Sequence, residues 1–270
     1  MTYKSAAENR EEAVRVLGED LGQLYHHLKQ DTYRLLLDWR IYKGLFGTNE
    51  QRVQLLNKAS GLLAHTIEGA LQERILLRLC RLNDPAEQNG NRNITIRALP
   101  PLIDESLRDE IESLVEQAGS VCQPIRKLRS KSLAHSDWTQ REKANGIFGT
   151  SRREIGRATD SVSAVIRWVA REMMHVELEL EAMVLPPSDE VAFLQLVYDG
   201  IAARESREEE RLDARKRNEW KSLKNLEPKY PNWLKRQRGS AVVPGSRLSS
   251  VPVVFGMSWF SKAARECPAF

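Results

Sequence analysis

The fold is decided by residues 155–183, which read IGRATDSVSAVIRWVAREMMHVELELEAM. The apolar residues in this stretch return every three or four positions, and Pro186 and Pro187 follow it closely. A period of 3.6 residues places such side chains along one face of a helix. The pattern therefore predicts one amphipathic helix of about eight turns, whose apolar face needs other helices to cover it.

Helical spacing extends outward from this stretch over almost all of the chain before residue 217, and strand-like alternation is nearly absent. We therefore expect an all-α bundle. From Ala6 to about Phe46 the chain favours helix, with interruptions expected at Gly18, at Gly22 and at residues 44–47. After Ser188 a last helix is expected, which continues as a polar, charge-rich rod.

A second apolar stripe follows Asn49, whose side chain can cap the start of a helix. That helix is expected to end near Asn83 to Pro85. Its stripe is expected to face the core and consists of Leu56, Ala59, Leu63, Ile67, Ala70 and Leu77. Residues 84–102 form a polar connection, in which residues 93–96 are a candidate for a short extended piece.

Helical spacing resumes over residues 103–118 and is expected to break just afterwards. Gly119 offers a helix end, and Pro124 fits comfortably only in the first turn of a new helix. The new helix would carry residues 129–135 and lead into a long crossover loop, residues 136–152.

Length and composition indicate a cytoplasmic protein with a core of its own. The chain has 270 residues and lacks both an apolar run of membrane-spanning length and the apolar core of a signal peptide. Cys80, Cys122 and Cys267 lie far apart without metal-ligand spacing. We therefore expect no metal site, no other cofactor and no membrane partner.

The formal net charge of +4 conceals an asymmetry along the chain. Residues 211–238 hold ten Lys and Arg against three acidic residues, with aromatic residues interleaved, whereas residues 1–210 are slightly acidic. A basic aromatic segment can bind single-stranded RNA, although a flexible solubilising segment is the commoner role of such a composition. We expect a helical domain at 1–217 and a poorly ordered tail at 218–270.

One motif stands out for its chemistry: Arg129-Ser130-Lys131-Ser132-Leu133-Ala134-His135. It combines a permanent cation with a group that titrates near neutrality, a pair of the kind that phosphate-ester cleavage uses. In a regular helix Arg129 and His135 lie within about 120° around the axis, so both can line the edge of one cleft.

In the functional interpretation, His135 moves a proton and Arg129 stabilises the charge on the phosphate. The surrounding residues that would hold the substrate are Arg126, Lys127, Ser130, Lys131 and Ser132. In the ordinary interpretation, Arg129 is a solvated helix residue and His135 is favoured at a helix C-terminus by the macrodipole. The spacing by itself favours the ordinary interpretation.

The motif resembles the Arg-polar-x-x-x-Ala-His pattern of HEPN domains, the helical nucleases of prokaryotic toxin and defence systems. Three upstream segments narrow this resemblance to the abortive-infection HEPN family of the AbiU type. They are WRIYKGLF at 39–46, LLNKA at 55–59 and LRLCRLND at 77–84. The resemblance spans roughly residues 30–185 and does not include the C-terminal tail.

The resemblance implies a helical bundle that dimerises, so that two Arg/His motifs face each other in one RNA-cleaving cleft. Arg129 and His135 match the catalytic pair, and the implied reaction is metal-independent attack by the RNA 2′-hydroxyl. An antitoxin or another defence-system protein is the implied partner besides RNA.

Ser130 departs from the family pattern, which most often has Asn, Asp or His at this position. This departure favours an alternative, a non-catalytic HEPN module that binds or regulates a partner. A second alternative is a helical scaffold with an RNA-binding tail.

Overall fold

The computed structural model describes residues 5–128, 150–180 and 189–234. The described residues are mainly helical, and their one sheet is a small antiparallel pair, β1 (Glu87–Gln88) and β2 (Asn91–Arg92). The prediction of an all-α fold is therefore confirmed. The chain divides into two compact units, Met1–Gln195 and Leu196–Phe270, and each is described by itself.

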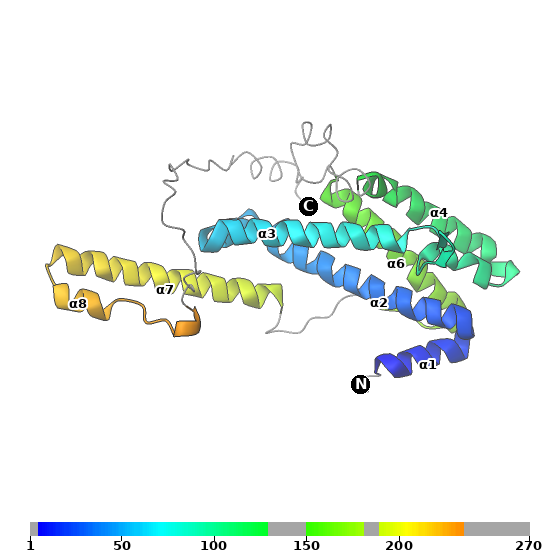
Figure 1. The fold of residues 1–270 in the computed structure, drawn as a ribbon, viewed down its shortest axis with the longest axis horizontal. Coiled ribbons are helices and arrows are strands. Elements are labelled where there is room, and N and C mark those ends of the chain that lie inside the picture. Colours follow the sequence, from blue (N-terminus) through cyan, green and yellow to red (C-terminus); the bar gives the residue numbers. More distant parts are fainter. Residues whose placement is uncertain (1–4, 129–149, 181–188, 235–270) are drawn as a thin grey trace, which may run out of the picture. The chain divides into compact units, whose positions relative to one another are not determined.

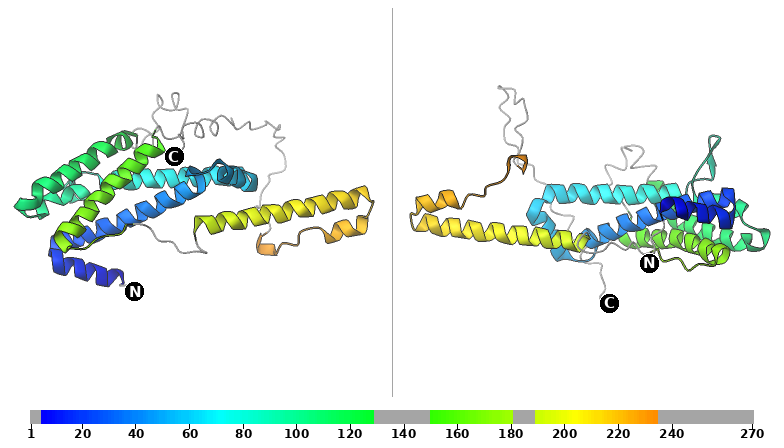
Figure 2. Two further views of the ribbon diagram at one scale, coloured as in Figure 1. Left: turned by 180° about the vertical axis from the view of Figure 1, so that it is seen from behind. Right: turned by 90° about the horizontal axis from the view of Figure 1, so that it is seen from below.

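The first unit is a helical bundle. Its main helices are α1 (Ala6–Leu17), α2 (Glu19–Tyr42), α3 (Glu50–Leu82), α4 (Glu105–Leu128) and α6 (Arg152–Met174). Helices α2, α3 and α6 pack on one another, α4 lies against α3 and α6, and α1 lies against α2 and α6 (Figures 1 and 2). The short connections are a π-helix, η1 (Lys43–Gly47), and two 3-10 turns, η2 (Ile96–Ala98) and η3 (Pro100–Leu102).

Apolar side chains from these helices form one continuous core. Its fully buried members include Leu28, Leu35, Ile75, Leu76, Leu79, Ile111, Val162, Val165 and Ile166. Burying a side chain of this size contributes about 1.5–3 kcal/mol relative to leaving it exposed. The apolar residues that recur with helical period in the sequence therefore form the buried core of this unit.

The helix at the centre of the sequence argument, α6, begins with a capping box at Ser151. Its hydroxyl accepts a hydrogen bond from the Glu154 backbone N–H at 3.2 Å, and the Glu154 carboxylate accepts one from the Ser151 N–H at 2.7 Å. This reciprocal pair satisfies two backbone donors that a helix start leaves open.

The predicted length of α6 is wrong, because the helix ends at Met174 and does not continue to residue 183. His175 adopts a left-handed conformation with φ of 54°, and the Val176 N–H donates to the carbonyl of Ala170 at 3.0 Å. Such a bond closes the last turn and redirects the chain. Apolar spacing in the following residues therefore reflects burial outside the helix, as for Leu180.

The predicted break after residue 118 is also wrong, because α4 runs without interruption through Pro124. Gly119 is buried in the middle of this helix. A Cβ atom at Gly119 would lie 2.5 Å from Nη2 of Arg97. The glycine therefore marks a close approach to the helix surface and not a helix end.

Among the glycines expected to interrupt the first helical region, Gly18 does end α1, with φ of 81°. Gly22 does not interrupt α2, because it lies buried inside that helix. A Cβ atom at Gly22 would lie 2.5 Å from the Cα of Val14. Gly22 therefore allows α1 and α2 to approach closely.

Helix α3 starts and ends as predicted. The Asn49 side chain accepts a hydrogen bond from the Gln51 N–H at 2.7 Å, and the helix ends at Leu82. The extended piece expected at residues 93–96 is confirmed only at Thr95, with φ of −147° and ψ of 152°, because Ile96 begins a 3-10 turn and the small strands lie earlier, on either side of Asn89-Gly90. Both of these turn residues have positive φ, which is typical of a type I′ hairpin turn.

The predicted core stripe of α3 is wrong over its middle part. Leu63 is 58% exposed and Ile67 is 36% exposed, whereas the neighbouring Ala64 is buried. Backbone angles at Ser60 are not helical, with φ of −168° and ψ of 94°, so a kink divides the helix here. Residues 59–70 therefore turn an apolar stripe outward.

The second unit contains most of α7 (Glu190–Lys216), α8 (Trp220–Asn225) and a 3-10 turn, η5 (Asn232–Leu234). Helix α8 lies within residues 218–270, the segment expected to be a poorly ordered tail. Asn218 takes a positive φ of 60° between α7 and α8. No helix in the described ranges has the length and apolar character needed to span a membrane.

Candidate functional site

The structure places two of the predicted site residues in the last turn of α4. Arg126 is partly exposed, and its Nη2 lies 3.8 Å from Oδ1 of Asp84. Lys127 is exposed to solvent. The other predicted site residues lie outside the described residues and are Arg129, Ser130, Lys131, Ser132 and His135.

The end of α4 is held against the end of α3 by a buried polar network. Nδ2 of Asn83 donates to the Leu79 carbonyl at 3.0 Å and to Sγ of Cys122 on α4 at 3.2 Å. Oγ1 of Thr95 lies 2.7 Å from the carbonyl oxygen of Asp84, the residue that also faces Arg126. These bonds connect the end of α3 to α4 at Cys122, and Asp84 lies beside Arg126.

Cys122 has no nucleophilic role in this network. Its side chain is fully buried, and burial raises the pKa of the Cys122 thiol to about 12. A thiolate is therefore strongly disfavoured near neutral pH. Cys122 acts as a packed hydrogen-bond acceptor for Asn83.

The start of α6 is held by a second polar group, which we call the α6 start cluster and which comprises Tyr42, Glu68, Gln72 and Arg152. Nη1 of Arg152 donates to the carbonyl of Gly47 at 2.7 Å, and Nε2 of Gln72 donates to the Tyr42 hydroxyl at 2.9 Å. Four different parts of the chain thus meet where α6 begins.

The Arg152 charge in the α6 start cluster opposes the effect of burial on the pKa values of its neighbours. Burial raises the pKa of Tyr42, and it also raises the pKa of the Glu68 carboxyl. The Arg152 guanidinium acts in the opposite direction on both groups. Sequence reasoning did not find this cluster, because its members share no spacing and only tertiary packing brings them together.

Deeper in the bundle, a buried carboxylate joins α2 to α3. Asp38 is 3% exposed, and its Oδ2 lies 2.8 Å from Nε of Arg74 and 2.8 Å from Nε of Arg78. Two guanidinium groups compensate the desolvation of this charge. Arg78, which belongs to one of the segments that carry the family resemblance, therefore has a structural role here.

The described residues contain no group of three or more His, Cys, Asp or Glu side chains that could hold a metal ion. Among the histidines, His26 is buried on α2, where its Nε2 lies 3.0 Å from Nε2 of Gln30. Its ring also makes an edge contact with His27, with 5.5 Å between the ring centroids.

These contacts define the setting of the Arg/His motif. In the sequence, residues 129–149 follow α4, which is described to Leu128, and precede α6, which begins at Arg152. Helices α4 and α6 pack against each other; Cys122 of α4 accepts a hydrogen bond from Asn83, and Arg152 at the start of α6 donates one to the carbonyl of Gly47. In the sequence, the motif therefore lies between two neighbouring helices.

An all-α bundle whose sequence carries an Arg/His motif between two of its helices resembles a HEPN domain. The family model HEPN_AbiU2, with the description AbiU2, matches residues 18–184. This match covers more than half of the chain, and the protein belongs to the AbiU2 family of HEPN domains. Neither a curated protein nor a solved structure matches the chain.

Proposed function

We propose that this abortive-infection HEPN protein is a metal-independent endoribonuclease, with Arg129 and His135 as its catalytic pair. The observation that carries the proposal is the AbiU2 match, which runs through α4, the motif segment and α6. The Arg/His motif is intact within this matched region.

In the proposed reaction, the 2′-oxygen of the RNA attacks the adjacent phosphorus, and the bond from phosphorus to the 5′-oxygen breaks. His135 serves as general acid or base for the 2′-hydroxyl proton or the leaving oxygen, and Arg129 stabilises the charge on the phosphoryl oxygens. The products are a 2′,3′-cyclic phosphate and a free 5′-hydroxyl. No metal ion is needed to balance these steps.

Arg126 and Lys127 support RNA binding next to the motif. Both lie in the last described turn of α4, directly before the motif in the sequence. The 3.8 Å separation between Arg126 and Asp84 is longer than a hydrogen bond, so the guanidinium keeps donors for a phosphate. We infer that these two side chains hold the RNA backbone beside the reacting phosphate.

The exposed stripe on α3 supports a homodimer. We call Ala59, Leu62, Leu63 and Ile67 the α3 apolar patch; Leu62 is 70% exposed. Exposed apolar side chains gathered within a short stretch of one helix are a feature of protein interfaces. Ile67 precedes Glu68 of the α6 start cluster, so a second copy bound there would lie close to the start of α6.

The proposed chemistry is tested by analysing RNA ends after incubation with the full-length protein, with and without a metal chelator. We expect fragments with 2′,3′-cyclic phosphate and 5′-hydroxyl ends, formed equally well in the chelator. RNA that stays intact would instead support the non-catalytic HEPN module, which Ser130 favours. Cleavage only with added metal would contradict the proposed mechanism.

The proposed dimer is tested by sedimentation of the double variant Leu63→Glu/Ile67→Glu. Two carboxylates in the α3 apolar patch should convert a dimer into a monomer, because burying them in an interface is unfavourable. Gln117→Glu, an exposed position on α4, is the matched control and should leave the mass unchanged. A double variant that stays dimeric would exclude this patch as the interface.

A further inference from the structure

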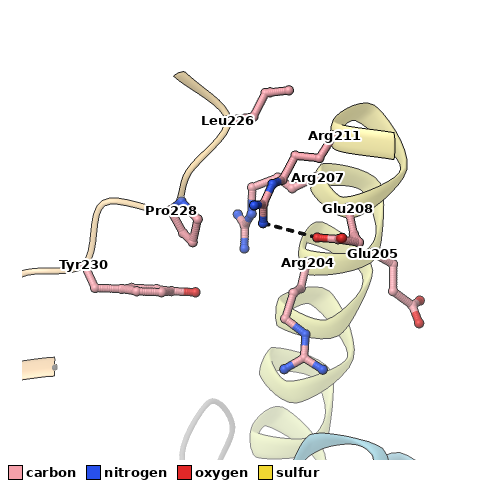
Figure 3. Close-up of a pocket in the computed structure, with 8 residues that line it drawn as sticks. All are labelled: Arg204, Glu205, Arg207, Glu208, Arg211, Leu226, Pro228 and Tyr230. Carbon is pink, nitrogen blue, oxygen red and sulfur yellow. Dashed lines mark hydrogen bonds and ion pairs between the residues drawn. The ribbon is translucent and has the colours of Figure 1, made fainter. Parts of the chain in front are cut away.

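The second unit contains a cavity of about 420 Å³ between α7 and the chain that follows α8 (Figure 3). One wall is α7, which contributes Arg204, Arg207 and Arg211. Pro228 and Tyr230 lie on the facing segment. The volume lies within the range of small-ligand sites, which hold about 300–1,000 Å³.

The three arginines lie on one face of α7, because they are separated by three and four residues. Arg204 and Arg207 form no ion pair within the part of the chain that the structure describes. Nη1 of Arg211 pairs with Oε2 of Glu208 at 3.3 Å, whereas its Nε is buried with no hydrogen-bond partner among the described residues. A buried donor of this kind favours an acceptor oxygen from a ligand.

More of the side chains that line the cavity are positively charged than negatively charged. Glu208 is engaged by Arg211, and Glu205 points away from the cavity in Figure 3. The opposite wall supplies the aromatic ring of Tyr230, which is 46% exposed. The cavity thus combines several guanidinium donors with an accessible aromatic ring.

We propose that this cavity binds one nucleotide of a single-stranded RNA, with its phosphate on the arginines and its base stacked on Tyr230. Guanidinium groups match phosphate oxygens in geometry, and an aromatic ring binds any base through its face. An acidic peptide would use the arginines but would have no need of the ring. The nucleotide chemistry follows from the cavity, whereas the choice of RNA rests on the proposed function.

The test measures binding of a fluorescein-labelled single-stranded RNA by anisotropy, with full-length His135→Ala protein so that the RNA is not cut. In this background, Tyr230→Ala and Arg207→Gln should each weaken binding about tenfold. Tyr230→Phe keeps the ring face and should bind like the parent. Arg215→Gln removes the same charge from an exposed position of α7 outside the cavity lining and should change affinity less than about twofold.

Competition experiments show whether the cavity prefers RNA, a free nucleotide or an acidic peptide. Free uridine monophosphate should compete more weakly than RNA, and polyglutamate should not compete at the cavity. The inference is overturned if Tyr230→Ala and Arg207→Gln bind RNA like the parent, or if either competitor binds more tightly than RNA does. Far-ultraviolet circular dichroism should show that both variants retain the total helix content of the parent.

The two proposals can fail separately. RNA that stays uncut, together with weaker RNA binding by the cavity variants, would contradict the proposed nuclease activity and support the proposed nucleotide site. RNA fragments with 2′,3′-cyclic phosphate and 5′-hydroxyl ends, together with unchanged RNA binding by the cavity variants, would support the nuclease and contradict the nucleotide site.

Discussion

The two compact units are both helical, but different interactions hold their helices. In the first unit, apolar side chains such as Leu35, Leu79 and Val165 are completely buried. Within residues 196–234 the buried apolar side chains are Ile201 and Ala214. Helix α7 instead carries ion pairs three residues apart, such as Lys216 with Asp213, and each such pair stabilises a helix by about 0.2–0.5 kcal/mol.

This difference separates two roles. In the first unit, tertiary packing holds α4 and α6, the helices before and after the motif segment, against each other. The helix with little apolar burial keeps its arginines accessible at a cavity, as ligand binding requires. Substitutions in the first unit should therefore change stability most strongly, whereas substitutions on α7 should change mainly what the protein binds.

The largest expected effect follows removal of the buried carboxylate. Asp38→Ala should lower the free energy of unfolding by about 3–5 kcal/mol, because the partly buried Arg78 would keep only the Asp31 carboxylate, 4.0 Å away. The exposed counterpart on α7, Asp213→Ala, should change it by less than about 0.5 kcal/mol. Chemical denaturation followed by circular dichroism measures both. Equal effects of the two substitutions would contradict the contrast between the units.

Alanine substitutions at two helical glycines should change stability in opposite directions, and both changes should be smaller than that of Asp38→Ala. Gly22→Ala should destabilise the protein by about 1–3 kcal/mol, because its Cβ would collide with the backbone of α1. Gly200→Ala on α7 should stabilise its helix by about 0.5–1 kcal/mol, because no atom lies within 4 Å of the added Cβ. Thermal unfolding of both variants checks the signs. Destabilisation by Gly200→Ala would show that α7 is more tightly packed.

The smallest effect is a pH dependence that arises at His26. Burial lowers the pKa of His26, and nearby His27, Lys29 and Arg10 lower it further. Because the unfolded chain takes up this proton first, stability should fall as pH drops below the unfolded value of about 6.5 and level off below the folded pKa. His26→Gln should flatten the dependence of unfolding free energy between about pH 7 and 5. Identical slopes in both proteins would exclude His26 as the cause.

The sequence predicted the helical class and several boundaries because these depend on local chemistry. Asn49 caps α3 through its own side chain, and Gly18 ends α1 with a backbone angle that glycine adopts readily. The hairpin turn at Asn89-Gly90 was a local signal too, but the extended piece was expected further along the chain.

Other features depend on tertiary contacts between distant parts of the chain, and local sequence patterns carry no information about these contacts. The apolar spacing of Leu63 and Ile67 is real, but it cannot tell a core face from a face that meets another molecule. Gly119 had the signature of a helix end, and only the position of Arg97 reveals its packing role. The site prediction rests on the motif and the family match, because Arg129 and His135 lie outside the described residues.

The central claim, that Arg129 and His135 perform RNA cleavage, is tested most directly by single-turnover cleavage rates. Arg129→Ala and His135→Ala should each lower the rate at least about 100-fold at saturating RNA, with unchanged unfolding curves. The matched controls Arg167→Ala and His175→Asn alter exposed residues on or just after α6 and should stay within about twofold of the parent. Either motif variant cleaving as fast as the parent would contradict the assignment.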